Sequence, residues 1–124
     1  FNDDSYLQKV NSIVHPKVGA HFKKWVSKQQ ADYVIKEAAI LFENNGYKQC
    51  DYIIVVTAPK DLRIERLLKR EPTTKEKIEA VMNNQWSDEA KIKLSDFVID
   101  NTAIEHMKAQ VLEIHYEIIK SPKF

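Results

Sequence analysis

The sequence predicts an α/β protein in which helices cover a parallel sheet. Three short apolar runs, at 32–41, 51–57 and 96–100, alternate with longer stretches whose apolar residues recur at helical spacing. The middle run, DYIIVVT, is apolar at consecutive positions, as in a strand that is buried on both faces of a parallel sheet. Strands that alternate with helices are typical of the α/β class.

The composition is that of one globular domain. The chain has 124 residues, of which 44% are hydrophobic and 30% charged, and this balance argues against a disordered chain. The net charge of +1 gives no overall field that would attract DNA or a membrane, so a polyanion would have to bind at a local cluster. Basic residues are interleaved with acids, which argues against a nucleic-acid-binding protein.

The compartment is predicted from three features. The apolar runs fall far short of the ~18–20 residues that span a bilayer. The opening residues FNDDSYLQKV lack both the basic start and the apolar core of a secretory signal. Cys50 is the only cysteine, which excludes an internal disulfide and suits a reducing compartment. We therefore expect a cytoplasmic protein without a membrane partner.

The first part of the chain, 1–30, is predicted to be helical. Apolar residues at i, i+3 and i+4 spacing predict two helices over 3–29. We expect the break between them at His15 and Pro16, because proline lacks an N–H and disfavours the helical conformation in the residue before it.

The second part, 31–70, is predicted to hold core strands and a helix. The runs 32–41 and 51–57 are rich in β-branched residues, which favour strands. A turn around Gly46 separates the two runs, and apolar residues at helical spacing predict a helix over 60–70.

The third part, 71–95, is predicted to be an almost entirely helical excursion. Thr73 or Thr74 is expected to cap one helix and Ser87 the next. The last part, 96–124, begins with the third short strand and ends with an amphipathic helix.

Five sequence motifs resemble those of dephospho-coenzyme A kinase. In chain order they are NSIVHP, EAAILFENNGYKQCDYIIVVTAP, RIERLLKR, NNQ and LSDFVIDN, and their order and spacing are similar to those of that family. The likeness covers nearly the whole chain. Two positions depart from the family pattern: Ala39 stands where a proline is usual, and Val81 stands where the family's lid often carries an arginine.

The resemblance implies a P-loop kinase that transfers the γ-phosphate of ATP to the 3′-hydroxyl of dephospho-coenzyme A, the final step of coenzyme A biosynthesis, with Mg²⁺. It also implies a parallel nucleotide-binding sheet, a helical substrate region that matches 1–30, and a mobile helical lid that matches 71–95. The family's phosphate-binding loop, G-x-x-x-x-G-K-[ST], has no counterpart here, because neither of the two glycines, Gly19 and Gly46, lies in such a context.

The chain is therefore expected to correspond to the C-terminal part of such a kinase. The P-loop, the first strands and the aspartate that activates the acceptor would lie upstream of Phe1. In related kinases the first strand lies between the strands matched here by 32–41 and 51–57, so the core would be incomplete. We expect the 124 residues alone to be inactive, to bind ATP and Mg²⁺ only together with the missing part, and to self-associate or exchange strands.

Two arginines are the predicted catalytic residues. Arg66 and Arg70 are four residues apart, so they project from one face of a helix. Guanidinium groups match the phosphate oxygens on which charge develops during phosphoryl transfer. By the resemblance, both arginines contact the ATP phosphates where the core meets the lid. The alternative is a solvated helix face with Glu65 and Glu71 as ionic partners.

The predicted substrate contacts are Asn11, His15 and Glu43. Glu43 follows the buried run 32–41, at the place where open α/β sheets bind their ligands, and is expected to orient the substrate or a magnesium-bound water. The alternative for Glu43 is a helix-start acid. Asn11 and His15 either contact a substrate oxygen or satisfy backbone groups at the expected bend.

The predicted nucleotide contacts are Asp100, Asn101 and Gln85. Asp100 and Asn101 follow the third strand, at the edge where related kinases hold adenine, and the Asn101 amide offers both a donor and an acceptor. Asp-Asn pairs are also common in plain turns. Gln85 lies in the part that matches the lid. The histidines show no metal-ligand spacing, so no metal site is expected from these residues.

Two other functions stay open from the sequence. One is a different nucleoside-monophosphate-type kinase, against which the motifs NSIVHP and LFENNGY argue because they match the coenzyme side of the family. The other is a non-catalytic binding domain that has lost its P-loop.

Overall fold

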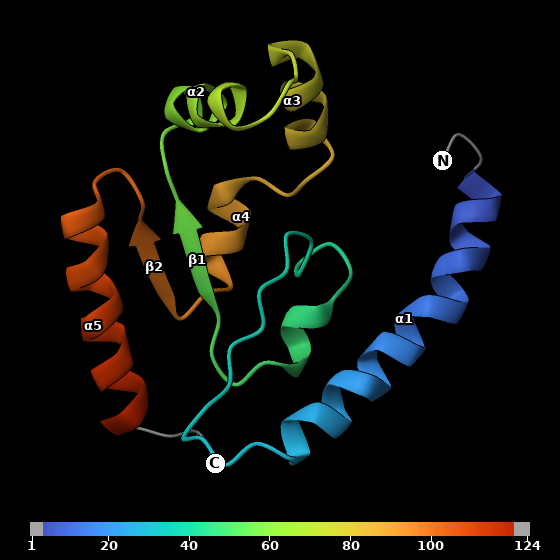
Figure 1. Ribbon diagram of the computed structural model, residues 1–124, viewed down its shortest axis with the longest axis vertical. Coiled ribbons are helices and arrows are strands. Elements are labelled where there is room, and N and C mark those ends of the chain that lie inside the picture. The colour runs from blue at the N-terminus through green and yellow to red at the C-terminus, as the bar shows by residue number, and fades with distance from the viewer. Residues whose placement is uncertain (1–3, 121–124) are drawn as a thin grey trace. The chain divides into compact units, whose positions relative to one another are not determined.

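The computed structural model describes residues 4–120, and the chain divides into two compact units, Phe1–Glu37 and Ala38–Phe124. The first unit contains one helix, α1 (Asp4–Ser27), and the second contains all the other helices and both strands. Figure 1 shows the elements in order along the chain. Of the helices within residues 4–120, none has the length and the apolar character that crossing a membrane requires.

The predicted break at His15 and Pro16 is wrong, because α1 runs without interruption for 24 residues through both of them. Proline removes a single N–H from the helix, the one that would bond to the carbonyl of Ser12. Ser12 is exposed, so water can hydrate its freed carbonyl, and the turns on either side keep their own hydrogen bonds. The apolar residues of α1 stay largely exposed; they include Tyr6, Ile13, Val14, Val18 and Trp25.

The predicted strand at 32–41 is also wrong. Residues 33–38 have no regular secondary structure, and residues 39–45 form turns, in which the N–H of Asn44 donates to the carbonyl of Ile40 (3.2 Å). A strand needs a neighbour that pairs with its backbone, and within residues 4–120 the sheet consists of β1 and β2, which pair with each other. The β-branched composition of the run predicted a strand without showing that a partner is present.

The second unit is built on a parallel pair of strands, β1 (Ile54–Thr57) and β2 (Phe97–Asp100), which pair in register from Ile54 with Phe97 to Thr57 with Asp100. The strands predicted at 51–57 and 96–100 and the α/β class are thereby confirmed. The remaining elements of this unit are η1 (Gly46–Gln49), α2 (Lys60–Arg70), α3 (Lys75–Asn83), α4 (Asp88–Lys93) and α5 (Ile104–Lys120).

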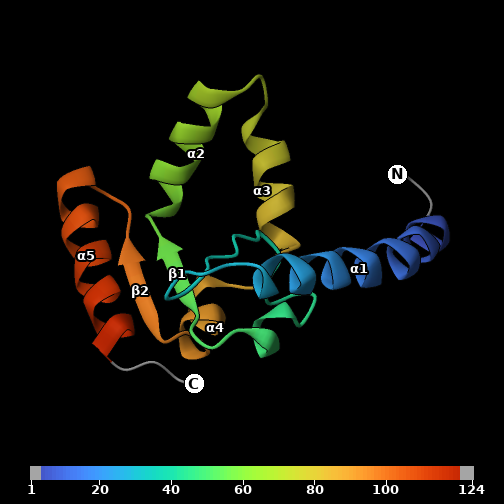
Figure 2. The same ribbon diagram turned by 60° about the horizontal axis from the view of Figure 1, so that its bottom comes forward.

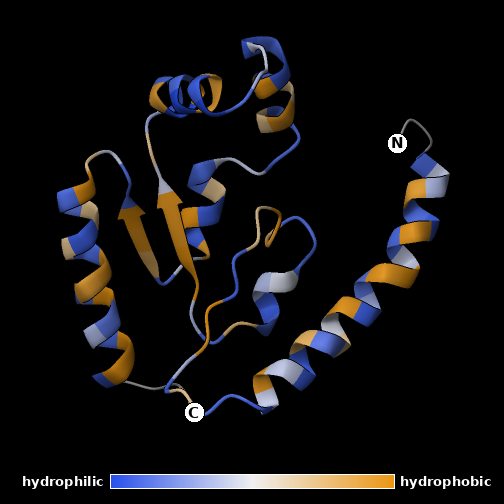
Figure 3. Cartoon of the chain, viewed as in Figure 1, coloured by the Kyte–Doolittle hydropathy of each residue, from blue (hydrophilic) through white to orange (hydrophobic). Residues whose placement is uncertain are grey.

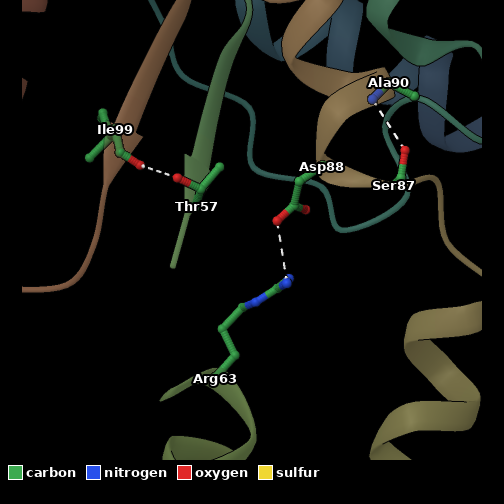
Figure 4. Close-up of polar contacts among 6 residues, drawn as sticks. All are labelled: Thr57, Arg63, Ser87, Asp88, Ala90 and Ile99. Atoms are coloured by element: carbon green, nitrogen blue, oxygen red, sulfur yellow. Dashed lines mark hydrogen bonds and ion pairs between the residues drawn. The ribbon is translucent and has the colours of Figure 1, made fainter. Parts of the chain in front are cut away.

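Two of these helices begin at the hydroxyl residues that the sequence indicates. The Thr74 Oγ1 accepts a hydrogen bond from the N–H of Lys77 (3.3 Å) at the start of α3. The Ser87 Oγ accepts one from the N–H of Ala90 (3.2 Å) at the start of α4, as Figure 4 shows. Each hydroxyl satisfies a backbone donor that has no partner inside its helix.

Different elements pack beside the two strands. In Figures 1 and 2, α5 lies beside β2, whereas α4 lies on the other side, next to β1. Val55 is buried in a cluster with Phe42 and Ile53, while its partner in the register, Val98, is 40% exposed. Figure 3 shows that both strands are apolar, and the core cluster forms where the loop around Phe42 packs on the segment of Ile53 and Val55.

Asp96 fixes the start of both strands. Its Oδ2 accepts a hydrogen bond from the N–H of buried Ile53 (2.8 Å), and its own N–H donates to the carbonyl of Ile53 (2.8 Å). At the other end, the Thr57 hydroxyl donates to the carbonyl of Ile99 (3.4 Å), which Figure 4 also shows. The side chain of Asp96 therefore closes a backbone ladder that would otherwise begin with an unpaired donor.

We expect Asp96→Ala to lower the free energy of unfolding by about 1–3 kcal/mol, because it leaves the buried N–H of Ile53 without an acceptor. Asp96→Asn keeps an oxygen acceptor and is expected to lose clearly less. Urea unfolding followed by far-UV circular dichroism, at one fixed protein concentration, measures both values. Equal losses in the two variants would contradict this role.

Candidate functional site

A cleft of about 550 Å³ lies at the carboxyl end of the sheet. Its lining comes from the end of β1, from α2 and α3, and from the residue that follows β2. Figure 2 shows how α2 and α3 stand beyond the carboxyl end of β1. The carboxyl edge of a parallel sheet is where open α/β proteins bind their ligands, so this cleft is the leading candidate site in the second unit.

The charged residues that line the cleft are mostly basic. They are Arg63, Arg66, Arg70, Lys77 and one acid, Glu71. Positive side chains that face one hollow raise the local potential there, although the whole chain is almost neutral. The cleft therefore suits an anionic ligand, and in particular one with several phosphate groups.

Arg66 joins α2 to the loop that follows β2. Its Nη1 donates to the carbonyl of Asn101 (2.6 Å) and its Nη2 to the carbonyl of Thr102 (3.0 Å). The N–H of Asn101 in turn donates to the carbonyl of Thr57 at the end of β1 (2.7 Å). The structure thus brings together two of the predicted site residues, Arg66 and Asn101, and both of them line the cleft.

Of the other predicted residues in this unit, Arg70 and Gln85 line the cleft and Asp100 does not. The Arg70 Nη2 lies 3.4 Å from the Glu71 Oε1 in an exposed ion pair. The Asp100 carboxylate accepts from both the N–H (3.0 Å) and the hydroxyl of Thr102. These are the hydrogen bonds of a turn residue, which was the alternative for the Asp-Asn pair.

Glu43 contacts α4 and the segment that precedes it. Its Oε1 accepts from the N–H of Trp86 (2.9 Å) and lies 3.6 Å from the Nζ of Lys91. The rings of Phe42 and Trp86 lie 5.8 Å apart, so two consecutive residues hold the same segment. Glu43 is not among the described residues that line the cleft, and its role toward substrate stays a prediction.

The surroundings of Glu43 favour its ionised form. Burial opposes ionisation, but the N–H of Trp86, the N–H of Glu43 itself and the ammonium of Lys91 outweigh it, so the pKa of the carboxyl is lowered from 4.5. The side chains of Glu43 and Lys91 are 17% and 15% exposed, which limits how far water screens their attraction. The second oxygen, Oε2, is buried and has no hydrogen-bond partner.

Three basic residues in or beside this site were not predicted from the sequence: Arg63 and Lys77, which line the cleft, and Lys91, which pairs with Glu43. Arg63 precedes Arg66 by three positions and Arg70 by seven, the spacing of one helix face, and this signal was present but not used. Lys91 carries no local signal, because its partner Glu43 is far away in the sequence.

Asn11 and His15 lie on α1 in the first unit, and their role as substrate contacts stays a prediction. Between residues 4 and 120, no three histidine, cysteine or acidic side chains come together in a way that could hold a metal ion.

Comparisons with known proteins agree on one family. A family model described as "Dephospho-CoA kinase" matches residues 1–106. Two curated relatives with that description, from Bacteroides fragilis and Idiomarina loihiensis, are 36% and 31% identical to the chain. These matches cover 92% and 93% of this chain and 56% and 57% of the relatives. The chain therefore spans just over half the length of the curated relatives it matches.

A solved structure has the same fold. It is titled "Crystal structure of TT1252 from Thermus thermophilus" and superposes on this chain with a TM-score of 0.88 at 26% sequence identity. The match covers 94% of this chain and 61% of that one.

Glu43→Gln is expected to lower the free energy of unfolding at neutral pH by roughly 1 kcal/mol, because the neutral amide loses the attraction of Lys91 and accepts less strongly from Trp86. Since the pKa of Glu43 is lowered on folding, its contribution is complete above its ordinary pKa of 4.5 and is lost as the pH falls through the lower, folded value. The difference between wild type and variant should therefore shrink as the pH falls below the ordinary pKa of 4.5.

Urea unfolding at a series of pH values measures this difference. The matched control is Glu79→Gln, whose partner Lys60 is 3.8 Å away in a more exposed pair, and it is expected to change little. A difference for Glu43→Gln that stays constant from neutral to acid pH would argue against the ionised contact.

Proposed function

The chain belongs to the dephospho-CoA kinase family, and from that premise we propose that it forms the C-terminal part of an enzyme that transfers the γ-phosphate of ATP to the 3′-hydroxyl of dephospho-coenzyme A. Family membership itself indicates a kinase of coenzyme A biosynthesis. The observation that supports the finer proposal is the basic cleft at the carboxyl edge of the sheet. In this cleft Arg66 of α2 is held in place by the carbonyls of Asn101 and Thr102.

The charge of the cleft matches the needs of phosphoryl transfer. Negative charge spreads over the equatorial oxygens of the phosphoryl group during transfer, and positive groups that are already in place stabilise it without having to rearrange. The hydrogen bonds of Arg66 to Asn101 and Thr102 go to neutral carbonyl oxygens, so no acid among residues 4–120 is paired with its charge. Arg70 forms an exposed pair with Glu71, which it would give up when it turns to a phosphate.

We assign the remaining predicted residues to the two substrates. Asn101 and Gln85 line the cleft, which supports contacts with ATP, and Asp100 shapes the adjoining turn. Glu43 is proposed for the dephospho-coenzyme A side on the strength of the motif LFENNGY. Asn11 and His15 are proposed for the same substrate on the strength of the motif NSIVHP alone.

The lining of the cleft does not suit a bare Mg²⁺ ion. The cleft lining has four basic side chains and one carboxylate, Glu71, and a divalent cation prefers a set of oxygen ligands. The described residues thus fit the phosphate groups of ATP and do not fit the bare metal. In the proposal Mg²⁺ neutralises phosphate charge as part of the metal–ATP complex, and no side chain of the described part is assigned to it.

The helical part 71–95 contains α3 and α4 and is proposed as the lid, and α1 is proposed as the substrate region. The free thiol of Cys50 suits the reducing cytoplasm, where we propose that the protein works.

We expect the 124-residue polypeptide on its own to release no ADP from ATP with dephospho-coenzyme A. Its sequence has no G-x-x-x-x-G-K-[ST] loop, whose backbone N–H groups and lysine would hold the phosphates. A longer product of the same gene that carries such a loop is expected to phosphorylate dephospho-coenzyme A. A coupled ADP-release assay measures turnover, with nucleoside monophosphates as alternative acceptors.

The outcomes of this assay separate the candidate functions. Turnover by the 124 residues alone would contradict the need for an outside loop. A preference for a nucleoside monophosphate would favour the other kinase. A loop-carrying product without turnover on any acceptor, or a gene that encodes no such loop upstream, would favour the binding domain and sink the proposal.

We also expect the 124-residue chain to self-associate. Within the described residues each strand of the sheet has one neighbour, and Ile54 and Val56 are 38% and 58% exposed on β1. Light scattering after size-exclusion chromatography should give a mass above 14.5 kDa. Val56→Lys should weaken the association, whereas Val111→Lys, at a comparably exposed position on α5, should not. A monodisperse monomer would rule the association out.

A further inference from the structure

Arg63 lines the same cleft as Arg66 and Arg70 but has a different type of partner. Its Nη2 lies 3.3 Å from the Oδ2 of Asp88, the first residue of α4 (Figure 4). Arg66 is bound by backbone carbonyls, and Arg70 pairs with its neighbour in the chain. Arg63 on α2 is thus paired with an acid on α4, and α3 lies between these two helices in the sequence.

The contact between Arg63 and Asp88 leaves the guanidinium incompletely satisfied. The ion pair joins one nitrogen to one oxygen, whereas a guanidinium can present two parallel donors to a carboxylate or a phosphate. The Nε of Arg63 is buried and has no hydrogen-bond partner. The two side chains are 37% and 36% exposed, so water weakens their attraction. A ligand with more charge and more acceptors would compete well for Arg63.

We propose that Arg63 is a further phosphate-binding residue of this cleft, and that Asp88 holds it until a polyphosphate group binds. The inference rests on the proposed function in one respect, that the cleft binds phosphate groups. When Arg63 turns to the phosphate, Asp88 loses its partner on α2. Occupation of the cleft therefore releases the tie between α2 and the start of α4, so Arg63 also links ligand binding to the helical part 71–95.

The proposal predicts opposite effects for the two partners. Arg63→Gln should weaken the binding of inorganic tripolyphosphate roughly tenfold, because a charged donor is lost. Asp88→Asn should strengthen it about threefold, because the competing acid is gone. In an Arg63→Gln background, Asp88→Asn should have no effect. A pair that only stabilised the fold would weaken binding in both single variants.

Isothermal titration of the longer, loop-carrying product with tripolyphosphate, at fixed ionic strength and protein concentration, gives the four affinities. The longer product is used because the 124 residues alone are expected to bind ATP only together with the missing part. The matched controls are Lys69→Gln and Glu65→Gln, which change the net charge by the same amounts on α2 outside the cleft lining. Both controls should bind like wild type. Arg66→Gln is the positive control and should bind more weakly. Circular dichroism of each variant checks that it is folded. If Arg63→Gln unfolds, Arg63→Lys takes its place and should also bind more weakly than wild type, because it keeps the charge without the two parallel donors of the guanidinium.

Each outcome decides between the proposals. Arg63→Gln that binds as tightly as wild type, while Arg66→Gln binds more weakly, overturns the Arg63 inference and leaves the cleft intact. If Asp88→Asn weakens the binding of tripolyphosphate, or changes it in the Arg63→Gln background, then Arg63 does not move from Asp88 to the phosphate as proposed. A protein in which neither Arg63→Gln nor Arg66→Gln weakens the binding of tripolyphosphate overturns both the inference and the proposed phosphate cleft.

Discussion

The pairing of β1 with β2 is the constraint on which the second unit depends. Because the strands are parallel and in register, the chain leaves both of them at the same edge, after Thr57 and after Asp100. α2 begins just beyond β1, which brings Arg66 within reach of the carbonyls that follow β2. A shift of the register by one residue would turn every strand side chain to the other face and separate these groups.

The cleft shows how a nearly neutral chain can make a local positive site. An arginine that donates to carbonyl oxygens is fixed in position and keeps its charge, whereas an arginine paired with an acid is fixed but neutralised. Arg66 is of the first kind, and Arg63 with Asp88 is of the second. The cleft thus combines the positive charge of Arg66, which is always available, with that of Arg63, which is available only when Arg63 is not paired with Asp88.

The sequence predicted those features that depend on local chemistry. The strands at 51–57 and 96–100 are apolar runs that end at turn residues, and each found its partner in the other. The run 32–41 has similar composition but no partner strand among residues 4–120, and composition does not contain that information. Pro16 does not end α1, because the hydrogen bonds of the neighbouring turns outweigh the one that proline removes. The pair of Glu43 with Lys91 joins distant parts of the chain, which helical spacing cannot reveal.

The two strands come from distant parts of the sequence, since the contact between Ile53 and Asp96 spans 43 positions. Forming the sheet therefore requires a long loop to close, and non-local closure of this kind slows folding. Helices α2, α3 and α4 all lie inside that loop, and they can form from local contacts first. The free-energy cost of closing a loop rises by only about 0.6 kcal/mol when the loop doubles in length. Insertions between these helices would therefore destabilise the sheet only slightly.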